Sequence, residues 1–429
     1  MATQTVHTNG IYHGLPTFDS SLKDLSAVIT GANGISGQHM LRVLAQAPER
    51  WSKIYCLSRR PPAIPGGLPA NAVHIPLDFL KSPEEIGEVL KKEGVKADYV
   101  FFFSYIQVEP KVGAALWSNA EDLCVVNTKL LSNFLEALPI ASIKPKRIML
   151  QTGAKNYGLH LGPTTVPQEE SDPRVMLEPN FYYPQEDYLW SYCEKHSIGW
   201  NVARPSFILG AVPDAAMNVC FPLAVYASVQ KHLGKPIEYP SDLTAWEMTQ
   251  VQSSAMLNGY LEEWAVLTDN AKDQAFNACD SSAFSWGKFW PKMAGWYGIG
   301  YERPSLKQED YKPVELPHEA PRGFGPRGTL RFRFTLTEWA KQPEVAQAWK
   351  ELAEKHGLVD KELRDVDRIF SFTDAALSWC YPINFSMDKA RKLGWHGFVD
   401  SSECILEVFK DFEKMKMIPP VPMVHVKFS

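Results

Sequence analysis

Disulfide pairing, a strong net charge and membrane-length apolar runs are all missing from this 429-residue sequence. Its seven cysteines are an odd number with no C-x-x-C spacing, so we expect reduced, buried thiols in a cytoplasmic protein. Lys and Arg number 44 against 49 Asp and Glu, and this net charge of -5 excludes a general attraction to nucleic acid or anionic membranes. The longest apolar stretches, such as Tyr99 to Phe103, are too short to span a bilayer, and Met1 to Thr17 lacks the pattern of a signal peptide.

Two common catalytic patterns are missing as well. The chain has no His-Glu-x-x-His motif and no cysteine cluster, so we expect no metal site. It also has no Gly-x-Ser-x-Gly motif, which would have indicated a serine nucleophile.

What the sequence does have is the composition of a folded globular protein, with 45% hydrophobic and 22% charged residues. Short apolar runs alternate with segments of helical periodicity in its first half, which predicts an α/β fold: a Rossmann-type, doubly wound parallel sheet with helices on both faces. We expect strands near 27–30, 53–57, 73–77, 98–103, 147–152 and 200–205, and helices over 34–45, from 82, over 121–138 and over 184–196.

The length predicts more than one domain. We expect a loose N-terminal arm over 1–25, an NADP-binding Rossmann domain over 26–235, and a smaller, mostly helical C-terminal substrate-binding cap over 236–429. Helices are expected in the cap near 247–264, 285–297, 336–356 and 402–415. Five prolines and several glycines between Pro304 and Arg331 predict a loop or flap there and not a folded unit.

The connection between the first predicted strand and helix is rich in glycine. Glycines at this place allow a tight turn and a close approach of the backbone to a pyrophosphate at the helix N-terminus, although a mere tight turn is the plainer interpretation. The strand before and the helix after the loop favour the cofactor interpretation. Its candidate residues are Thr30, Gly31, Asn33, Gly34, Ile35, Ser36 and Gly37.

The second strand ends without the acidic residue that would bind a ribose 2′-hydroxyl. Arg59 and Arg60 stand there instead, and two guanidinium groups match a 2′-phosphate in charge and geometry. The sequence therefore favours NADPH/NADP+ over NADH, the alternative being a solvated basic turn. Asp78, just past the third strand, is placed either to contact the adenine or to cap a helix, and Phe79 beside it is a further cofactor candidate.

The Tyr-x-x-x-Lys pair of many dehydrogenases is absent, because the fourth residue after Tyr182 is Glu186 and the fourth after Tyr183 is Asp187. A lysine for a catalytic tyrosine must come from elsewhere. Lys155 follows the fifth strand, and we expect it to project into the cleft at the carboxyl end of the sheet.

Two motifs around these residues resemble a known family. Leu-Gln-Thr-Gly-x-Lys-x-Tyr at 150–157 and Asn-Phe-Tyr-Tyr-x-x-Glu-Asp at 180–187 are similar to those of the progesterone 5β-reductase / iridoid synthase (PRISE) family of atypical, extended short-chain dehydrogenases/reductases. The glycine loop, the arginine pair and Arg204-Pro205 also fit. The similarity covers about residues 26–300 well and resumes more weakly over about 337–420.

The resemblance implies reduction, with NADPH, of the carbon–carbon double bond of an α,β-unsaturated carbonyl compound. It makes Lys155 and Tyr182 the catalytic pair, whereas without Lys155 and the glycine loop Tyr182 would be interpreted as a packed aromatic side chain. A hydroxyl aimed at the carbonyl oxygen would stabilise the enolate, and a nearby ammonium would strengthen the effect. The remaining cofactor candidates are Ser104, Tyr105, Gln151, Tyr182 itself, Pro205 and Ile208.

Two departures put the substrate in doubt. The family commonly has Thr-Trp where this chain has Ser104-Tyr105, and the Pro-rich segment 304–331 has no counterpart in its plant members. Phe370, Phe372 and Trp379 are candidates either for a pocket wall or for the core. We expect a hydrophobic small-molecule substrate, no nucleic-acid partner and no membrane span, and we leave a homodimer open. Isomerisation or cyclisation of a reactive intermediate, and a non-catalytic NADP sensor, stay open as alternatives.

Overall fold

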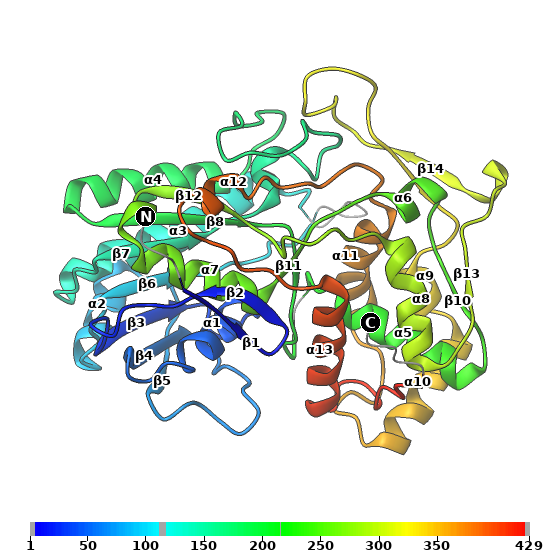
Figure 1. Cartoon of the computed structure of the whole chain (residues 1–429), viewed down its shortest axis with the longest axis horizontal. Coiled ribbons are helices and arrows are strands. Elements are labelled where there is room, and N and C mark those ends of the chain that lie inside the picture. Colours follow the sequence, from blue (N-terminus) through cyan, green and yellow to red (C-terminus); the bar gives the residue numbers. More distant parts are fainter. Residues whose placement is uncertain (1–4, 111–116, 215, 425–429) are drawn as a thin grey trace.

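The computed structural model describes residues 5–110, 117–214 and 216–424. Its centre is a parallel sheet of seven strands in the order β12-β8-β7-β6-β3-β4-β5 (Figure 1). The strand order reverses beside β3, which confirms the predicted doubly wound Rossmann-type fold. The strands are β3 (Leu25–Thr30), β4 (Trp51–Ser58), β5 (Ala72–Pro76), β6 (Tyr99–Phe102), β7 (Arg147–Gln151), β8 (Gly199–Pro205) and β12 (Gln274–Ala278).

Helices cover both faces of this sheet. Successive strand residues point to opposite faces, so Ile29 and Phe101 pack with α1 (Ile35–Leu44) and α7 (Ala255–Leu267). Val28 and Phe102 pack on the other face with α2 (Pro83–Lys92), α3 (Ala120–Ile140) and α4 (Tyr182–His196). Because both faces are buried, the strands are continuous apolar runs, which is why the sequence reveals them.

The sheet uses residues on both sides of the domain boundary expected at 235. Strand β12 pairs in parallel with β8, and helix α7 packs on α1, although both follow residue 235. The helix expected over 247–264 is interrupted: α6 (Leu243–Glu247) is followed by β11 (Gln252–Ser254), which pairs with β9 (Phe207–Leu209), and only then by α7. A three-residue polar strand such as β11 has no periodicity that sequence reasoning can detect.

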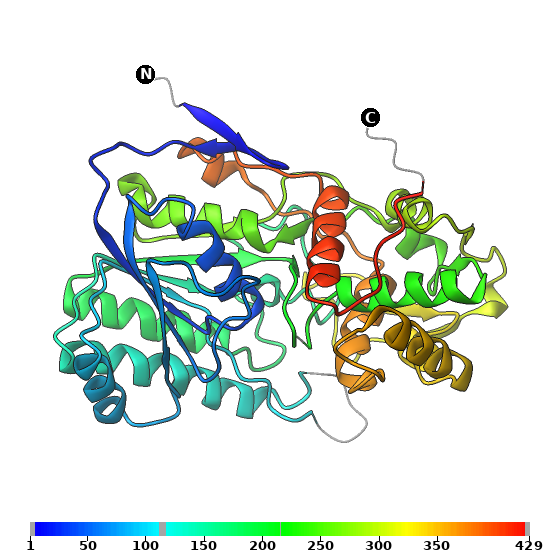
Figure 2. The same cartoon turned by 90° about the horizontal axis from the view of Figure 1, so that it is seen from below.

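The C-terminal part of the chain forms a mostly helical cap beside the sheet, as Figures 1 and 2 show. The helix expected over 336–356 is two helices, because Pro343 begins a new one. Two short parallel strands, β10 (Ile237–Glu238) and β13 (Tyr301–Glu302), pair at the edge of the cap (Figure 1). The cap helices are α5 (Cys220–Leu233), α6, α8 (Trp286–Tyr297), α9 (Leu336–Ala340), α10 (Pro343–His356), α11 (Val366–Ser378) and α13 (Ser401–Lys414), whereas α12 (Asp388–Lys392) lies against β12 of the sheet (Figure 1).

The expectation of a loose N-terminal arm is wrong for the described part of 1–25. Strands β1 (Val6–Asn9) and β2 (Tyr12–Pro16) form an antiparallel hairpin, and Tyr12 and Leu15 are buried in the main core. His13 also pairs with Phe398, near the C-terminal end of the chain. The anchoring contacts are long-range, so the polar sequence of the arm does not reveal them.

The expectation that 304–331 contains no folded unit is also wrong. Strand β14 (Lys312–Glu315) pairs antiparallel with β15 (Thr329–Phe332), so the Pro-rich segment holds most of a hairpin whose strands are joined by residues 316–328. Pro313 is compatible with this ribbon because a strand at an edge can lack one donor. Over the described ranges, no helix is long and apolar enough to cross a lipid bilayer.

Candidate active site

The glycine loop joins β3 to the N-terminus of α1. Gly31 has a positive φ of 61°, and a Cβ there would lie 2.8 Å from the Phe103 carbonyl oxygen. A Cβ at Gly37 would lie 2.5 Å from the Gly31 oxygen, so the turn requires both glycines. Gly34 is the N-cap residue, and no side chain caps the first turn of α1. The backbone N–H groups of this turn are therefore available to an anion, and the loop fits a dinucleotide pyrophosphate.

Side chains from neighbouring strands support the loop. Gln151, at the end of β7, donates a 2.8 Å hydrogen bond from Nε2 to the Ser36 hydroxyl on the first turn of α1. Its Oε1 atom is buried without a hydrogen-bond partner among the described residues, so it remains available to a bound molecule. Thr30 accepts a 3.1 Å hydrogen bond at Oγ1 from the Phe103 N–H. Asn33 and Ile35 lie half-buried in the same turn.

The arginine pair follows β4, the strand beside β3 in the sheet. Arg59 and Arg60 are both exposed, and Arg60 lies 3.8 Å from the carboxylate of Asp214. Asp214 also binds Arg368 of α11 at 2.7 Å. Sequence reasoning missed Asp214, which comes from a loop more than 150 residues away in the chain.

Asp78 and Phe79, two and three residues past the end of β5, have different environments. Asp78 is half-buried and accepts a 3.0 Å hydrogen bond from the Leu80 N–H, as in a local turn. The Phe79 ring packs on Phe102 and Phe134 in the core. The Phe79 side chain therefore belongs to the core, and the prediction that Phe79 contacts the cofactor stays only for its backbone.

Lys155 and Tyr182 come from separate segments that meet beside the sheet. Lys155 lies in a short 3-10 helix, η1 (Ala154–Tyr157), directly after β7, and Tyr182 is the first residue of α4. A Cβ added to Gly153 would lie 3.0 Å from the Tyr182 hydroxyl and 3.3 Å from the Pro205 carbonyl oxygen. The hydroxyl therefore lies against the backbone that leads into Lys155.

A buried amide joins the two segments. Asn180 donates a 2.9 Å hydrogen bond to the Lys155 carbonyl oxygen and accepts a 3.1 Å bond from the Tyr182 N–H. Sequence reasoning did not assign Asn180 a role, although it is the first residue of the second family-like motif.

The electrostatics of the pair suit a donor and a cation. Burial lowers the pKa of Lys155 to about 8, against the opposing influence of Glu178 and Cys124, so the amine is mostly charged at neutral pH. The ammonium lies 4.6 Å from the Trp117 ring centroid and 5.4 Å from that of Phe181. Burial raises the pKa of Tyr182, with Tyr105 adding to the shift, so its hydroxyl keeps its proton.

The neighbouring motif residues have structural roles. The Tyr183 hydroxyl donates to the Asn156 carbonyl oxygen and accepts from the Val175 N–H, both at 2.8 Å. Glu186, which stands where other dehydrogenases have lysine, is buried and pairs with Arg204 at 3.0 Å. Tyr183 and Glu186 therefore hold α4 in position, and the Tyr182 hydroxyl takes no part in these contacts.

The other predicted residues gather at the carboxyl ends of the strands. Ser104 and Tyr105 follow β6, Pro205 ends β8 and Ile208 lies in β9. The Tyr105 ring lies 5.5 Å from that of Phe181, and its hydroxyl donates to Gln107. In the cap, Phe370 and Trp379 are core residues, whereas the Phe372 ring lies 6.1 Å from Trp117 at the Lys155 site.

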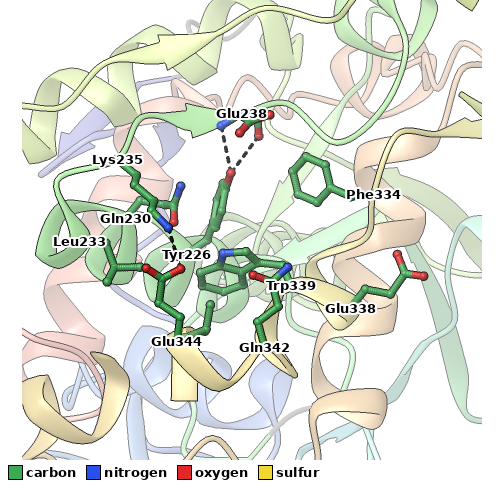
Figure 3. Close-up of a pocket in the computed structure, with 11 residues that line it drawn as sticks. Tyr226, Gln230, Leu233, Lys235, Glu238, Phe334, Glu338, Trp339, Gln342 and Glu344 are labelled. Atoms are coloured by element: carbon green, nitrogen blue, oxygen red, sulfur yellow. Dashed lines mark hydrogen bonds and ion pairs between the residues drawn. The ribbon is translucent and has the colours of Figure 1, made fainter. Parts of the chain in front are cut away.

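A cavity of about 360 Å³ lies apart from these residues, in the cap between α5, α9 and α10 (Figure 3). Tyr226 and Trp339 meet edge-to-face in it, and Lys235 pairs with Glu344 at 2.6 Å. None of the predicted site residues lines it, and among the described residues no group of three or more His, Cys, Asp or Glu side chains could hold a metal ion.

Comparison with known proteins adds names to this geometry. The PRISE-like Rossmann-fold domain family matches residues 27–324. The short chain dehydrogenase gsfE of Penicillium aethiopicum is 29% identical over 92% of this chain and 99% of its own length. The 3-oxo-Delta(4,5)-steroid 5-beta-reductase of Arabidopsis thaliana is 29% identical over 92% and 93% of the two chains. The (S)-8-oxocitronellyl enol synthase of Catharanthus roseus is 28% identical over 92% of each.

Solved structures share the fold. A UDP-glucose 4-epimerase from Thermotoga maritima aligns with a TM-score of 0.56 at 12% identity, covering 91% of this chain and 99% of its own. At this identity the likeness concerns the fold alone. The family and the names of its relatives support an oxidoreductase of the short-chain dehydrogenase/reductase type, and a Rossmann fold implies a nicotinamide cofactor.

Proposed function

Because the chain belongs to the PRISE-like Rossmann-fold family, we propose that it is an NADPH-dependent reductase of the carbon–carbon double bond in an α,β-unsaturated carbonyl compound. The substrate would be a hydrophobic small molecule, consistent with the aromatic rings of Trp117, Phe181 and Phe372 around Lys155. All seven cysteines are free, which supports a cytoplasmic location.

In this proposal NADPH would be held by the glycine loop, Arg59 and Arg60, and when bound it would supply a hydride to the substrate β-carbon. Hydride addition would leave negative charge on the carbonyl oxygen as an enolate, and a proton from solvent at the α-carbon would then give the saturated product. Tyr182 donates a hydrogen bond to that oxygen, which its raised pKa permits because the hydroxyl stays protonated. Lys155 places a positive charge in the same water-poor site, where an ammonium stabilises an enolate more strongly than it would in water.

The observation that carries this proposal is the meeting of Tyr182 with the Lys155 segment. The Tyr182 hydroxyl lies against Gly153, and Asn180 bonds both backbones. A non-catalytic sensor would need neither side chain. Redox-neutral isomerisation or cyclisation remains the second candidate, because several relatives are named enol synthases.

The test is to follow NADPH absorbance with a panel of enones and enals, and to analyse the products. Reductase activity predicts NADPH consumption and a product in which the double bond is saturated. NADPH-independent conversion of a substrate to an isomer or ring-closed product would favour the second candidate. Turnover of neither kind across the panel would count against both.

A further inference from the structure

The Pro-rich segment 304–331 packs on the chain that follows Lys155. The Arg322 N–H donates a 3.3 Å hydrogen bond to the Pro163 carbonyl oxygen. A Cβ at Gly158 would lie 3.0 Å from Pro321 Cβ, so the two backbones approach closely. The residues that directly follow Lys155 are therefore covered by the Pro-rich segment.

An acidic residue lies where the two segments meet. Glu178 Oε1 is 2.8 Å from His160 Nε2, and Glu178 Oε2 is 3.4 Å from His318 Nε2. His160 follows Lys155 by five residues, whereas His318 belongs to the Pro-rich segment. The side chain of His160 is nine-tenths buried, so this contact is not a solvated surface pair. One histidine from each segment thus engages each carboxylate oxygen.

This cluster is adjacent to Lys155 across one aromatic ring. The Lys155 ammonium lies 4.6 Å from the Trp117 ring centroid. The His160 ring packs edge-to-face with the same indole, and the two ring centroids are 6.1 Å apart. Within the described ranges no carboxylate comes within 4.0 Å of the ammonium, so it has no direct ion pair. Glu178 nevertheless acts on it through space and opposes the lowering of the Lys155 pKa by burial. The pKa of Glu178 is itself lowered against its own burial, first by the hydrogen bond and charge of His160 and then by Lys155 and His318.

We propose that Glu178, held between His160 and His318, is a positioning residue that supplies the remote counter-charge for Lys155, and that the Pro-rich segment contributes to the active site through His318. This inference rests on the proposed function, because it assumes that Lys155 acts as an ammonium. The separation has a chemical advantage. A carboxylate in direct contact would occupy the N–H donors of the lysine, whereas a remote one favours the charge and leaves the donors free.

The surroundings of each group set the direction of the expected change. Burial is the largest influence on Lys155 and lowers its pKa to about 8, while Glu178 and, to a smaller extent, Cys124 oppose it. Glu178 in turn is faced by His160, Lys155 and His318. Removing the charge of Glu178 leaves burial without its main opponent. The pKa of Lys155 then falls, and the ammonium is lost at a lower pH.

The experiment measures Lys155 itself. The full-length protein is labelled with acetic anhydride over a range of pH, and the acetylated fraction of the Lys155 peptide is quantified by mass spectrometry. In Glu178→Gln we expect the labelling midpoint to move to lower pH by about one unit, roughly tenfold in proton affinity. The alkaline limb of kcat/KM for an enone should move with it. Glu319→Gln, an exposed carboxylate next to His318, is the matched control and should leave both unchanged.

A second variant keeps the test decisive if Glu178→Gln folds poorly. His318→Ala removes the contact from the Pro-rich segment while retaining the carboxylate, so both midpoints should shift in the same direction by a smaller amount. An unchanged labelling midpoint in the folded variants overturns the proposal, and so does a shifted midpoint with an unchanged alkaline limb. Failure of the proposed function has another signature, namely full reductase activity in Lys155→Ala.

Discussion

The cofactor loop and the Lys155 site are built in opposite ways. The loop is contiguous: residues 30–37 contain the strand end, the glycines and the helix start, and Gln151 adds one supporting hydrogen bond. The Lys155 site is assembled from the end of β7, the start of α4, residue 117, the cap and the Pro-rich segment. A dinucleotide is recognised through backbone geometry, which a short motif can encode. An organic substrate is recognised through side chains, which can arrive from anywhere in the chain.

The largest effect that tests this difference between the two sites is expected from removing the hydroxyl of Tyr182. Tyr182→Phe should lower kcat by about 10²–10³, the range for losing one oxyanion donor, with little change in NADPH affinity. Steady-state kinetics with an enone, and cofactor binding followed by fluorescence, measure the two effects separately. An equal loss of cofactor affinity would show that Tyr182 belongs to the contiguous cofactor site and not to the assembled one.

Tyr183→Phe is the neighbouring control for that experiment. Its hydroxyl hydrogen-bonds the backbone at Asn156 and Val175, so its removal should reduce stability and have little effect on turnover by the folded enzyme. Lys155→Ala should also slow turnover. Combined with Tyr182→Phe, it should cost less than the sum of the two free-energy changes if the pair acts as a unit.

The next effect in size concerns cofactor choice. Replacing Arg59 and Arg60 with alanine should raise the KM for NADPH and reduce its preference over NADH, since each charge-assisted hydrogen bond contributes about 1.5–3 kcal/mol. The comparison of kcat/KM for the two cofactors measures this. Equal use of NADPH and NADH by the unaltered protein would contradict the assignment.

A smaller loss is expected from Gly37→Ala. The added Cβ would lie 2.5 Å from the Gly31 carbonyl oxygen and 2.7 Å from Ala32 Cα, which are backbone atoms and must shift. Relieving such overpacking costs about 1–3 kcal/mol, so cofactor affinity should fall roughly tenfold or more. Gly300→Ala is a contrast outside the site, because the added Cβ would lie no closer than 3.6 Å, an ordinary contact distance, to Pro236. Normal cofactor affinity in Gly37→Ala would mean that the loop is only a turn.

The smallest expected effect tests the exposed ion pair beside the arginines. Asp214→Asn removes a carboxylate 3.8 Å from Arg60, so the guanidinium no longer has to exchange one anion for another when it binds a phosphate. Both groups are solvated, and the gain in NADPH affinity should be at most about fivefold. The gain should vanish at high salt. A loss of affinity would mean that Asp214 orients Arg60 and does not compete for it.

Local sequence determined the sheet, the cofactor loop and the two motif segments. Buried parallel strands are apolar runs, and a glycine that must avoid a backbone atom, such as Gly37, leaves a local signature. Tertiary structure alone decided the contacts that are distant in sequence: the anchoring of the N-terminal hairpin on the core, the addition of β12 to the sheet, and the approach of Asp214 to Arg60. The ion pair between Glu178 and His318 joins residues that are 140 positions apart in the sequence. His318 lies in a proline-rich stretch that has no helical or strand periodicity. Such a contact forms because packing brings two irregular segments together, and nothing in either segment specifies the other.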